Sequence, residues 1–275
     1  MSAELDQIIP VLVGGNVHFI LVGGMAAILH GSARVTFDVD IVYERSTENV
    51  RRLVETLKPY SPCLRGAPAG LPFILDEQTV KHGLNFTLTT TLGDLDLFGE
   101  IAGVGPYNEV LPNSDEVQAF GVTFLCVGLD RLIHMKRAAR RPKDLEAIAE
   151  LRVILEAEEH AATEAEGIAR ELGRILTEAI QKQSVVRFFY NGQLRVVEPQ
   201  TYGISTSGNE ALRGYQREGG STSGTAARLK LFELAKISKL EVTAERFAGA
   251  RPEHNLHDCA MGEVIATLPR LKTDR

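Results

Sequence analysis

Apolar residues in the first 155 positions follow two spacings, one typical of helices and the other of strands. Helical spacing runs from residue 5 to 12, from 25 to 30, from 47 to 58 and from 129 to 155, with a break near Arg141 and Pro142. Continuous or alternating apolar runs predict strands at 18–22, 39–43, 85–91, 92–98 and 122–127. Residues 61–72, rich in Pro and Gly, are predicted to be a loop. Helices and strands in this succession predict an α/β (α+β) domain.

The later part of the chain has a different pattern. Residues 156–166 are rich in Ala and Glu and predict a helical linker, which is followed by a helix at 168–181. Strands are then predicted at 185–190, 194–199, 211–216 and 229–234, separated by Asn- and Gly-rich hairpin signals. We therefore expect a domain at 1–158, a linker and leading helix at 159–182, and a small, mostly antiparallel β domain at 183–275.

Composition and charge narrow the class of protein. The chain is 44% hydrophobic and 24% charged, which excludes collagen-like and intrinsically disordered proteins. Residues 1–159 contain 14 Lys and Arg against 22 Asp and Glu, a net charge of −8, whereas residues 160–275 contain 16 against 14, a net charge of +2. The overall charge of −6 argues against a general nucleic-acid coat, and the uneven distribution favours two domains with different partners.

Cysteine usage and hydropathy indicate the compartment. The three cysteines form no C-x-x-C pair, so neither a disulfide framework nor a zinc ribbon is indicated. The longest apolar stretch, residues 17–29, is interrupted by Gly23 and Gly24 and is too short to cross a bilayer. We expect a cytoplasmic protein without a membrane partner.

A Gly-Gly pair and three aspartates indicate chemistry. Gly23 and Gly24 stand between a predicted strand and a predicted helix, where bare backbone N–H groups and the helix dipole favour phosphate binding. Asp38 and Asp40 are two residues apart on a strand, so both carboxylates point to one face. Asp96 adds a carboxylate from a later strand. Three such oxygen ligands suit Mg²⁺.

The ordinary alternative is that paired aspartates cap a strand or face solvent, and for a lone Asp-x-Asp motif that alternative is favoured. Here the Gly-Gly pair precedes Asp38 by fourteen residues and a strand carboxylate follows, which favours function. Asp94, on the same face as Asp96, is the alternative third carboxylate. We predict Asp38, Asp40 and Asp96 as catalytic residues and metal ligands.

Together these motifs resemble the polymerase-β-like nucleotidyltransferase superfamily, and more closely its toxin-like branch, which includes abortive-infection toxins. The resemblance covers about residues 5–155. Its motifs are LVGGMAAILHG at 21–31, RVTFDVD at 34–40, LGDLDLFG at 92–99, LIHMK at 132–136 and RPKD at 141–144. It implies a nucleotidyltransferase fold with a mixed sheet, a divalent metal (Mg²⁺ or Mn²⁺), and a nucleoside triphosphate (NTP) as substrate.

The resemblance also implies roles for single residues. Gly23 and Gly24 would hold the nucleotide phosphates, and Asp96 would be the base that faces the acceptor hydroxyl. Lys136 would reach the triphosphate, for which the alternative is an ordinary solvated helix face. Asp144 would anchor Lys136 or Arg141.

Two residues that precede the aspartates complete the implied nucleotide site. Arg34 and Thr36 would orient either the triphosphate or the loop that carries Asp38.

The second half resembles a WYL domain, a small β-barrel-like fold related to Sm proteins and thought to sense nucleotide or nucleic-acid ligands. The match covers about residues 170–250, with VVRFFY at 185–190, RVVEP at 195–199 and LRGY at 212–215. Glu210-Ala211-Leu212 stands where a Trp-Tyr-Leu triplet is expected. The candidate ligand contacts are Arg213, Tyr215 and Arg228, since arginine pairs with phosphate and tyrosine stacks on bases. The alternative is a solvated polar face of the barrel.

The expected reaction transfers a nucleoside monophosphate (NMP) from an NTP to a hydroxyl, with release of pyrophosphate. The resemblance implies the 3′ end of a tRNA as acceptor and a toxin or phage-defence effector whose WYL-like domain acts as sensor. A protein acceptor (AMPylation) uses the same chemistry and stays open. The alternative from another class is a non-catalytic or antitoxin-like regulatory protein that binds nucleotide or nucleic acid. An antitoxin or other regulatory partner and a homodimer are further expectations.

Overall fold

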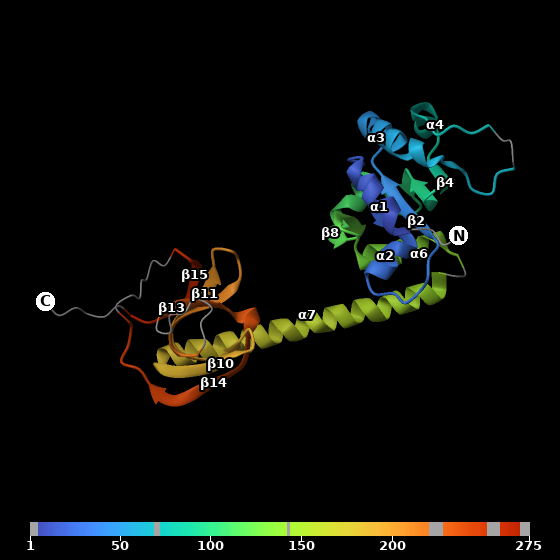
Figure 1. The fold of residues 1–275 in the computed structure, drawn as a ribbon. Helices are drawn as coiled ribbons and strands as arrows, with labels where there is room; N and C mark the ends of the chain where they lie inside the picture. Colours follow the sequence, from blue (N-terminus) through green and yellow to red (C-terminus); the bar gives the residue numbers. More distant parts are fainter. Residues whose placement is uncertain (1–4, 69–71, 142–143, 220–227, 252–258, 270–275) are drawn as a thin grey trace. The chain divides into compact units, whose positions relative to one another are not determined.

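The computed structural model describes residues 5–68, 72–141, 144–219, 228–251 and 259–269. The chain divides into two compact units, residues 1–159 and 160–275 (Figure 1). Each unit contains its own cluster of buried apolar side chains. Among the described residues, no helix combines the length and the apolar character needed to span a membrane.

The first unit alternates helices with strands. Its elements are α1 (Leu5–Gly14), β1 (Phe19–Val22), α2 (Gly23–Leu29), β2 (Asp38–Tyr43), α3 (Thr47–Leu57), β3 (Cys63–Leu64), α4 (Glu77–His82), β4 (Asn85–Thr90), β5 (Gly93–Phe98), β6 (Glu100–Ile101), β7 (Gly105–Pro106), α5 (Tyr107–Val110), β8 (Ser114–Ala119), β9 (Val122–Val127), α6 (Leu129–Ala139) and the first part of α7 (Asp144–Gln181).

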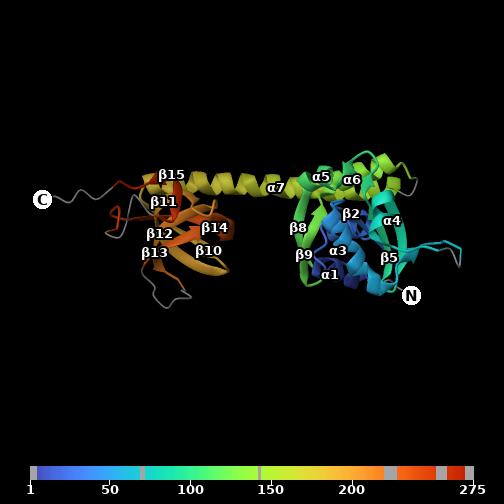
Figure 2. The ribbon, with the colours of Figure 1, turned by 90° about the horizontal axis from the view of Figure 1, so that it is seen from above.

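Seven strands form one mixed sheet in the order β3-β4-β5-β2-β1-β9-β8. The pairs β2–β5 and β1–β9 are parallel, and the other pairs are antiparallel. Figure 2 shows α1 and α3 on one side of this sheet and α6 on the other. The prediction of an α+β domain with a mixed sheet is therefore confirmed.

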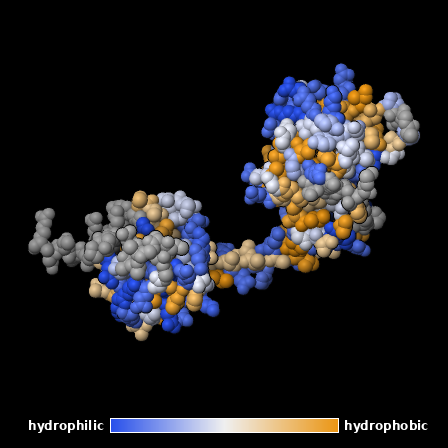
Figure 3. Space-filling view, in the orientation of Figure 1, coloured by the Kyte–Doolittle hydropathy of each residue, from blue (hydrophilic) through white to orange (hydrophobic). Residues whose placement is uncertain are grey.

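Helix α3 illustrates how the pattern of apolar residues becomes packing. Val50, Leu53 and Leu57 recur at helical spacing and are at most 1% exposed, while Ser46 caps the helix by accepting a hydrogen bond from the N–H of Asn49. The opposite face is charged, and hydrophilic residues gather over α3 in Figure 3. The amphipathic helix that the sequence predicts is the one that the structure contains.

The prediction of a loop at 61–72 is wrong in one part that matters for the site. Residues Cys63 and Leu64 form the short strand β3, which pairs with β4 at the edge of the sheet. The pairing continues past the strand, since the N–H of Arg65 donates to the carbonyl of Thr87 at 2.9 Å. A two-residue strand is too short to produce the alternation by which strands are recognised.

The second unit is built on antiparallel strands packed against the end of α7. The strands are β10 (Ser184–Tyr190), β11 (Gln193–Ser205), β12 (Glu210–Glu218), β13 (Arg228–Glu233), β14 (Ile237–Arg246) and β15 (Met261–Thr267). Their order is β13-β12-β11-β10-β14, and β15 pairs with the second half of β11. The sequence analysis predicted no strands at the positions of β14 and β15. Among the described residues β13 and β14 are not paired with each other, so a closed Sm-like barrel stays a prediction.

The predicted linker and leading helix are one element. Helix α7 runs without interruption from Asp144 to Gln181, and it begins in the first unit and ends in the second. Leu151 is buried in the core of the first unit, whereas Leu176 and Ile180 are buried in that of the second. The predicted break near Arg141 and Pro142 is confirmed, since α6 ends at Ala139, Arg140 has φ +51°, and α7 begins at Asp144.

Candidate active site

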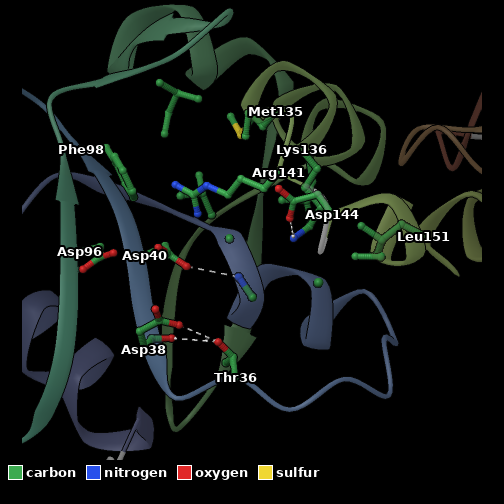
Figure 4. Close-up of a pocket in the computed structure, with 18 of the residues that line it drawn as sticks. Thr36, Asp38, Asp40, Asp96, Phe98, Met135, Lys136, Arg141, Asp144 and Leu151 are labelled. Carbon is green, nitrogen blue, oxygen red and sulfur yellow. Dashed lines mark hydrogen bonds and ion pairs between the residues drawn. The ribbon is translucent and has the colours of Figure 1, made fainter. Parts of the chain in front are cut away.

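The three predicted aspartates meet on one face of the sheet. Because β2 and β5 are parallel neighbours, Asp38 lies in register with Asp94, and Asp40 lies in register with Asp96. Residues in register on adjacent strands share a face, so all four carboxylates project to the same side. One oxygen each from Asp38, Asp40 and Asp96 lies within 4.8 Å of the other two (Figure 4).

The Gly-Gly pair lies directly against these carboxylates. Gly23 has φ +68°, and a Cβ added there would lie 1.9 Å from Oδ2 of Asp40. At Gly24 an added Cβ would lie 2.4 Å from Oγ1 of Thr36. The N–H of Gly24 donates to Oδ2 of Asp40 at 3.3 Å. The glycines therefore allow close approach of the backbone to Asp40, and the predicted phosphate role stays a prediction.

Two of the clustered carboxylates, Asp40 and Asp96, have raised pKa values. Burial, reinforced by the charges of Asp38 and Asp96, raises the pKa of Asp40 to about 6, against the opposing effects of the Gly24 N–H and Lys136. Burial also raises the pKa of Asp96, although the nearby Arg65 opposes the rise. A cation bound between these groups would favour their charged forms. The cluster thus has the electrostatics of a cation site.

A cleft of about 450 Å³ opens beside the carboxylates, between β2, β5, α2, α6 and the start of α7. Lys136 of α6 lines it with a side chain only 16% exposed, and its Nζ lies 3.9 Å from a carboxylate oxygen of Asp144. Arg141 also lines the cleft, and its side chain extends into it (Figure 4). The cleft therefore has carboxylates on one wall and cations on another.

The loop between α2 and β2 forms the rim of the cleft. Thr36 Oγ1 donates to a carboxylate oxygen of Asp38 at 2.8 Å (Figure 4). Arg34 is held by α7, since its Nε donates to Glu150 at 2.8 Å and its Nη2 to Glu146 at 3.2 Å. Glu150 also accepts from the hydroxyl of Ser32 at 2.9 Å. Sequence reasoning missed Glu150, because a glutamate on a predicted helix has no distinguishing pattern.

Arg65 is the second residue that sequence reasoning missed. Its guanidinium forms an ion pair with Asp96, lies 3.1 Å from Asp94 and lies 3.7 Å from Asp38. Asp94 in turn accepts from the hydroxyl of Thr89 at 2.8 Å and lies outside the group of three carboxylates. The geometry therefore groups Asp96, and not Asp94, with Asp38 and Asp40.

The donor set fits a hard divalent cation. Three carboxylates from two adjacent strands each offer an oxygen to one point, and Mg²⁺ and Mn²⁺ prefer oxygen ligands and retain some water. The ligands would be Asp38, Asp40 and Asp96. No other cluster of at least three metal-ligating side chains occurs among the residues that the structure describes.

Two of the three candidate ligand contacts of the second unit lie together on β12. Arg213 and Tyr215 lie two residues apart on β12 and so share a face. The guanidinium of Arg251 lies over the ring of Tyr215, 4.4 Å from its centroid. Arg228 lies in register with Gln216, and its side chain is outside the described part of the chain.

Neither a protein-family model nor a curated protein sequence matches the chain. Among solved structures, the chain is similar to the crystal structure of the lincosamide antibiotic adenylyltransferase LnuA with lincomycin bound. The sequence identity is 16%, the match covers 56% of this chain and 98% of that chain, and the TM-score is 0.39. A similarity at this level carries no weight for the function of the chain.

Proposed function

We propose that the first unit is a nucleotidyltransferase that moves an NMP from an NTP to a hydroxyl acceptor. One observation carries the proposal above all others: three carboxylates lie within 4.8 Å of one another beside a cleft that also contains Lys136 and Arg141. Transfer from a triphosphate requires two kinds of group: carboxylates that bind a divalent metal, and cations that bind the phosphates.

Each side of the cleft has its own task in the proposed reaction. Asp38, Asp40 and Asp96 would hold the divalent metal, which supplies charge stabilisation at the reacting phosphate. Lys136, steadied by Asp144, binds the triphosphate as a point charge, and Arg141 adds a guanidinium for a second phosphate. We assign the proton of the attacking hydroxyl to Asp96, whose carboxylate lines the cleft beside that of Asp40.

The acceptor that we propose is the 3′-terminal hydroxyl of a tRNA, which would make the protein a growth-inhibiting or phage-defence effector. The first unit has a net charge of −8, so the second unit, at +2, would supply the contacts to RNA phosphates. A hydroxyl on a protein is the competing acceptor, and the experiment below separates the two.

The test is to incubate the whole chain with Mg²⁺, each α-³²P-labelled NTP, total RNA and cell lysate. Asp38→Asn and Asp40→Asn should each lower transfer by about a hundredfold or more, since each removes a metal ligand. Both variants should fold, because the charges of Asp38 and Asp40 repel each other and either substitution removes this repulsion. Asp115→Asn, the same change at an exposed site on β8, is the matched control and should retain activity.

The distribution of label decides between the alternatives. Label in RNA that depends on Asp38 supports the tRNA acceptor, and label in protein supports AMPylation. Absence of label from both pools, with an NTP still bound, would refute the transferase and favour a regulatory nucleotide-binding protein.

A further inference from the structure

We infer that Arg65 is a built-in counter-ion of the carboxylate cluster, which competes with a divalent metal for Asp96 and offsets the charge that would otherwise repel a nucleotide. The inference goes beyond the proposed transfer reaction and rests on it only where the nucleotide is concerned. The part that concerns the metal rests on Arg65 and the carboxylates alone.

The fold delivers Arg65 to this position by backbone pairing. Arg65 continues β3 and bonds to Thr87 of β4, and Thr87 lies in register with Asp96 of β5, which lies in register with Asp40 of β2. Arg65 therefore stands at one end of a row of residues that crosses three strands of the sheet. Its place is set by main-chain hydrogen bonds, and its side chain is only 27% exposed.

The guanidinium of Arg65 contacts two of the candidate metal ligands and also Asp94, which is not one of them. One nitrogen, Nη2, pairs with Asp96, and the other, Nη1, lies 3.1 Å from Asp94 and 3.7 Å from Asp38. Asp94 is not one of the three clustered carboxylates and is fixed by Thr89. Asp94 thus anchors Arg65 at the cluster, and the positive charge faces two of the three metal ligands.

The positive charge of Arg65 has different effects on a metal ion and on a nucleotide. Four carboxylates face this side of the sheet, and Arg65 contacts three of them, whereas Lys136 stands on the far wall with Asp144. A cation within 4 Å of two ligands weakens the attraction of those ligands for a metal ion. The same cation lowers the repulsion between the carboxylates and an incoming triphosphate. Arg65 therefore weakens the binding of a metal ion alone and strengthens the binding of a nucleotide.

The test measures Mn²⁺ binding to the whole chain by electron paramagnetic resonance, without nucleotide. Arg65→Gln removes the competing charge and should tighten Mn²⁺ binding by about tenfold or more. Arg65→Lys keeps the charge but cannot bridge two carboxylates, so its affinity for Mn²⁺ should lie between those of the wild type and Arg65→Gln. The matched control is Arg51→Gln, the same loss of charge at an exposed residue of α3 whose partner is Glu48, and it should leave Mn²⁺ affinity unchanged.

A second arm measures binding of the α,β-methylene analogues of the four ribonucleoside triphosphates to metal-free protein. Arg65→Gln should weaken the analogue that binds best to the wild type by several-fold. Tighter metal binding together with weaker nucleotide binding is an outcome that a merely structural role would not produce, since loss of structure weakens both.

The outcomes separate this inference from the proposed function. Weaker or unchanged Mn²⁺ binding in a folded Arg65→Gln protein overturns the inference, and if that variant fails to fold, wild-type affinity in Arg65→Lys overturns it. The expected Mn²⁺ order without any NMP transfer supports the inference and refutes the transfer reaction. Absence of Mn²⁺ binding from every variant removes the metal site and with it both proposals.

Discussion

Two glycines of the first unit have similar φ angles but different surroundings. Gly23 has φ +68° and Gly121 has φ +75°, and both values lie in the left-handed region that non-glycine residues avoid. An added Cβ at Gly121 would meet nothing within 4 Å, whereas at Gly23 it would overlap the carboxylate of Asp40. Substitutions at Gly23 and Gly121 therefore separate the cost of backbone strain from the cost of displacing a metal ligand.

We predict that Gly23→Ala and Gly121→Ala each lower the free energy of unfolding by about 1–2 kcal/mol through backbone strain. Only Gly23→Ala should also lose Mn²⁺ binding and NMP transfer, because its Cβ pushes Asp40 out of the cluster. Urea unfolding and Mn²⁺ titration of both variants provide the measurement. Equal Mn²⁺ affinity in the two variants would contradict the proposed role of Gly23.

How far the sequence predicts this site depends on the residue. Asp38 and Asp40 are recognisable because an Asp-x-Asp pair on a strand puts two carboxylates on one face. The sequence favours Asp96 over Asp94, and the structure groups Asp96 with Asp38 and Asp40. The sequence alone left Asp94 open, because both side chains project to that face, and the partner that holds Asp94 apart, Thr89, lies on another strand. Partners that are distant in the sequence leave no local pattern.

At the scale of elements, most helices and strands were predictable, whereas the two-residue strand β3 and the ten-residue strand β14 were missed. The amphipathic helix α3 and the strands β4 and β5 follow from the spacing of their apolar residues. The two-residue strand β3 lies in a segment whose Pro and Gly content predicts a loop, yet it carries Arg65 to the site. A strand of this length is stabilised by pairing with β4, which is a tertiary effect.

Helix α7 contributes to the site through its first turns. Glu150 accepts hydrogen bonds from the Ser32 hydroxyl, the Ala33 N–H and Arg34 Nε, so it fixes the start of the loop that leads to Thr36 and Asp38. Among the described residues Glu146 accepts from Arg34 alone, and its side chain is 83% exposed. The two glutamates lie one helical turn apart and differ in how many loop groups they hold.

We predict that Glu150→Ala raises the KM for the NTP and lowers kcat/KM by about tenfold, because a loosened rim displaces Thr36 and Asp38. Glu146→Ala is the matched control and should change either value less than threefold, since exposed pairs contribute little. Steady-state kinetics at several NTP concentrations provides the measurement. Equal effects of the two substitutions would show that the rim does not depend on Glu150.

At the scale of the whole molecule, the two units have separate cores and different charge. The core of the first unit is formed by the sheet with its helices, and that of the second by β10–β14 with the end of α7. Within the second unit Glu198 is fully buried and accepts from Arg251 Nε at 2.6 Å and from Arg217 Nε at 2.5 Å. Because the cores are separate, we predict two unfolding transitions. Only the transition of the second unit should depend on Glu198.

Acid should destabilise the second unit through this cluster. Burial alone would raise the pKa of Glu198, but hydrogen bonds from Arg251 and Arg217 outweigh it and lower the pKa below its usual value. A carboxyl whose pKa is lower in the folded state than in the unfolded state stabilises the fold above about pH 4.3, and that stabilisation is lost as the pH falls through the folded pKa. The unfolding temperature of the second unit should therefore fall steeply below about pH 4.

The substitution Glu198→Gln tests the direction of this pH dependence, since it leaves Arg217 and Arg251 beside a neutral side chain. It should lower the stability of the second unit by about 3 kcal/mol at pH 7 and flatten its dependence on acid, while the transition of the first unit stays in place. Glu241→Gln removes an exposed carboxylate paired with Arg187 and should shift neither transition measurably. Calorimetry from pH 3 to pH 7 distinguishes the outcomes. If the acid dependence were as steep in Glu198→Gln as in the wild type, the buried cluster would not be its cause.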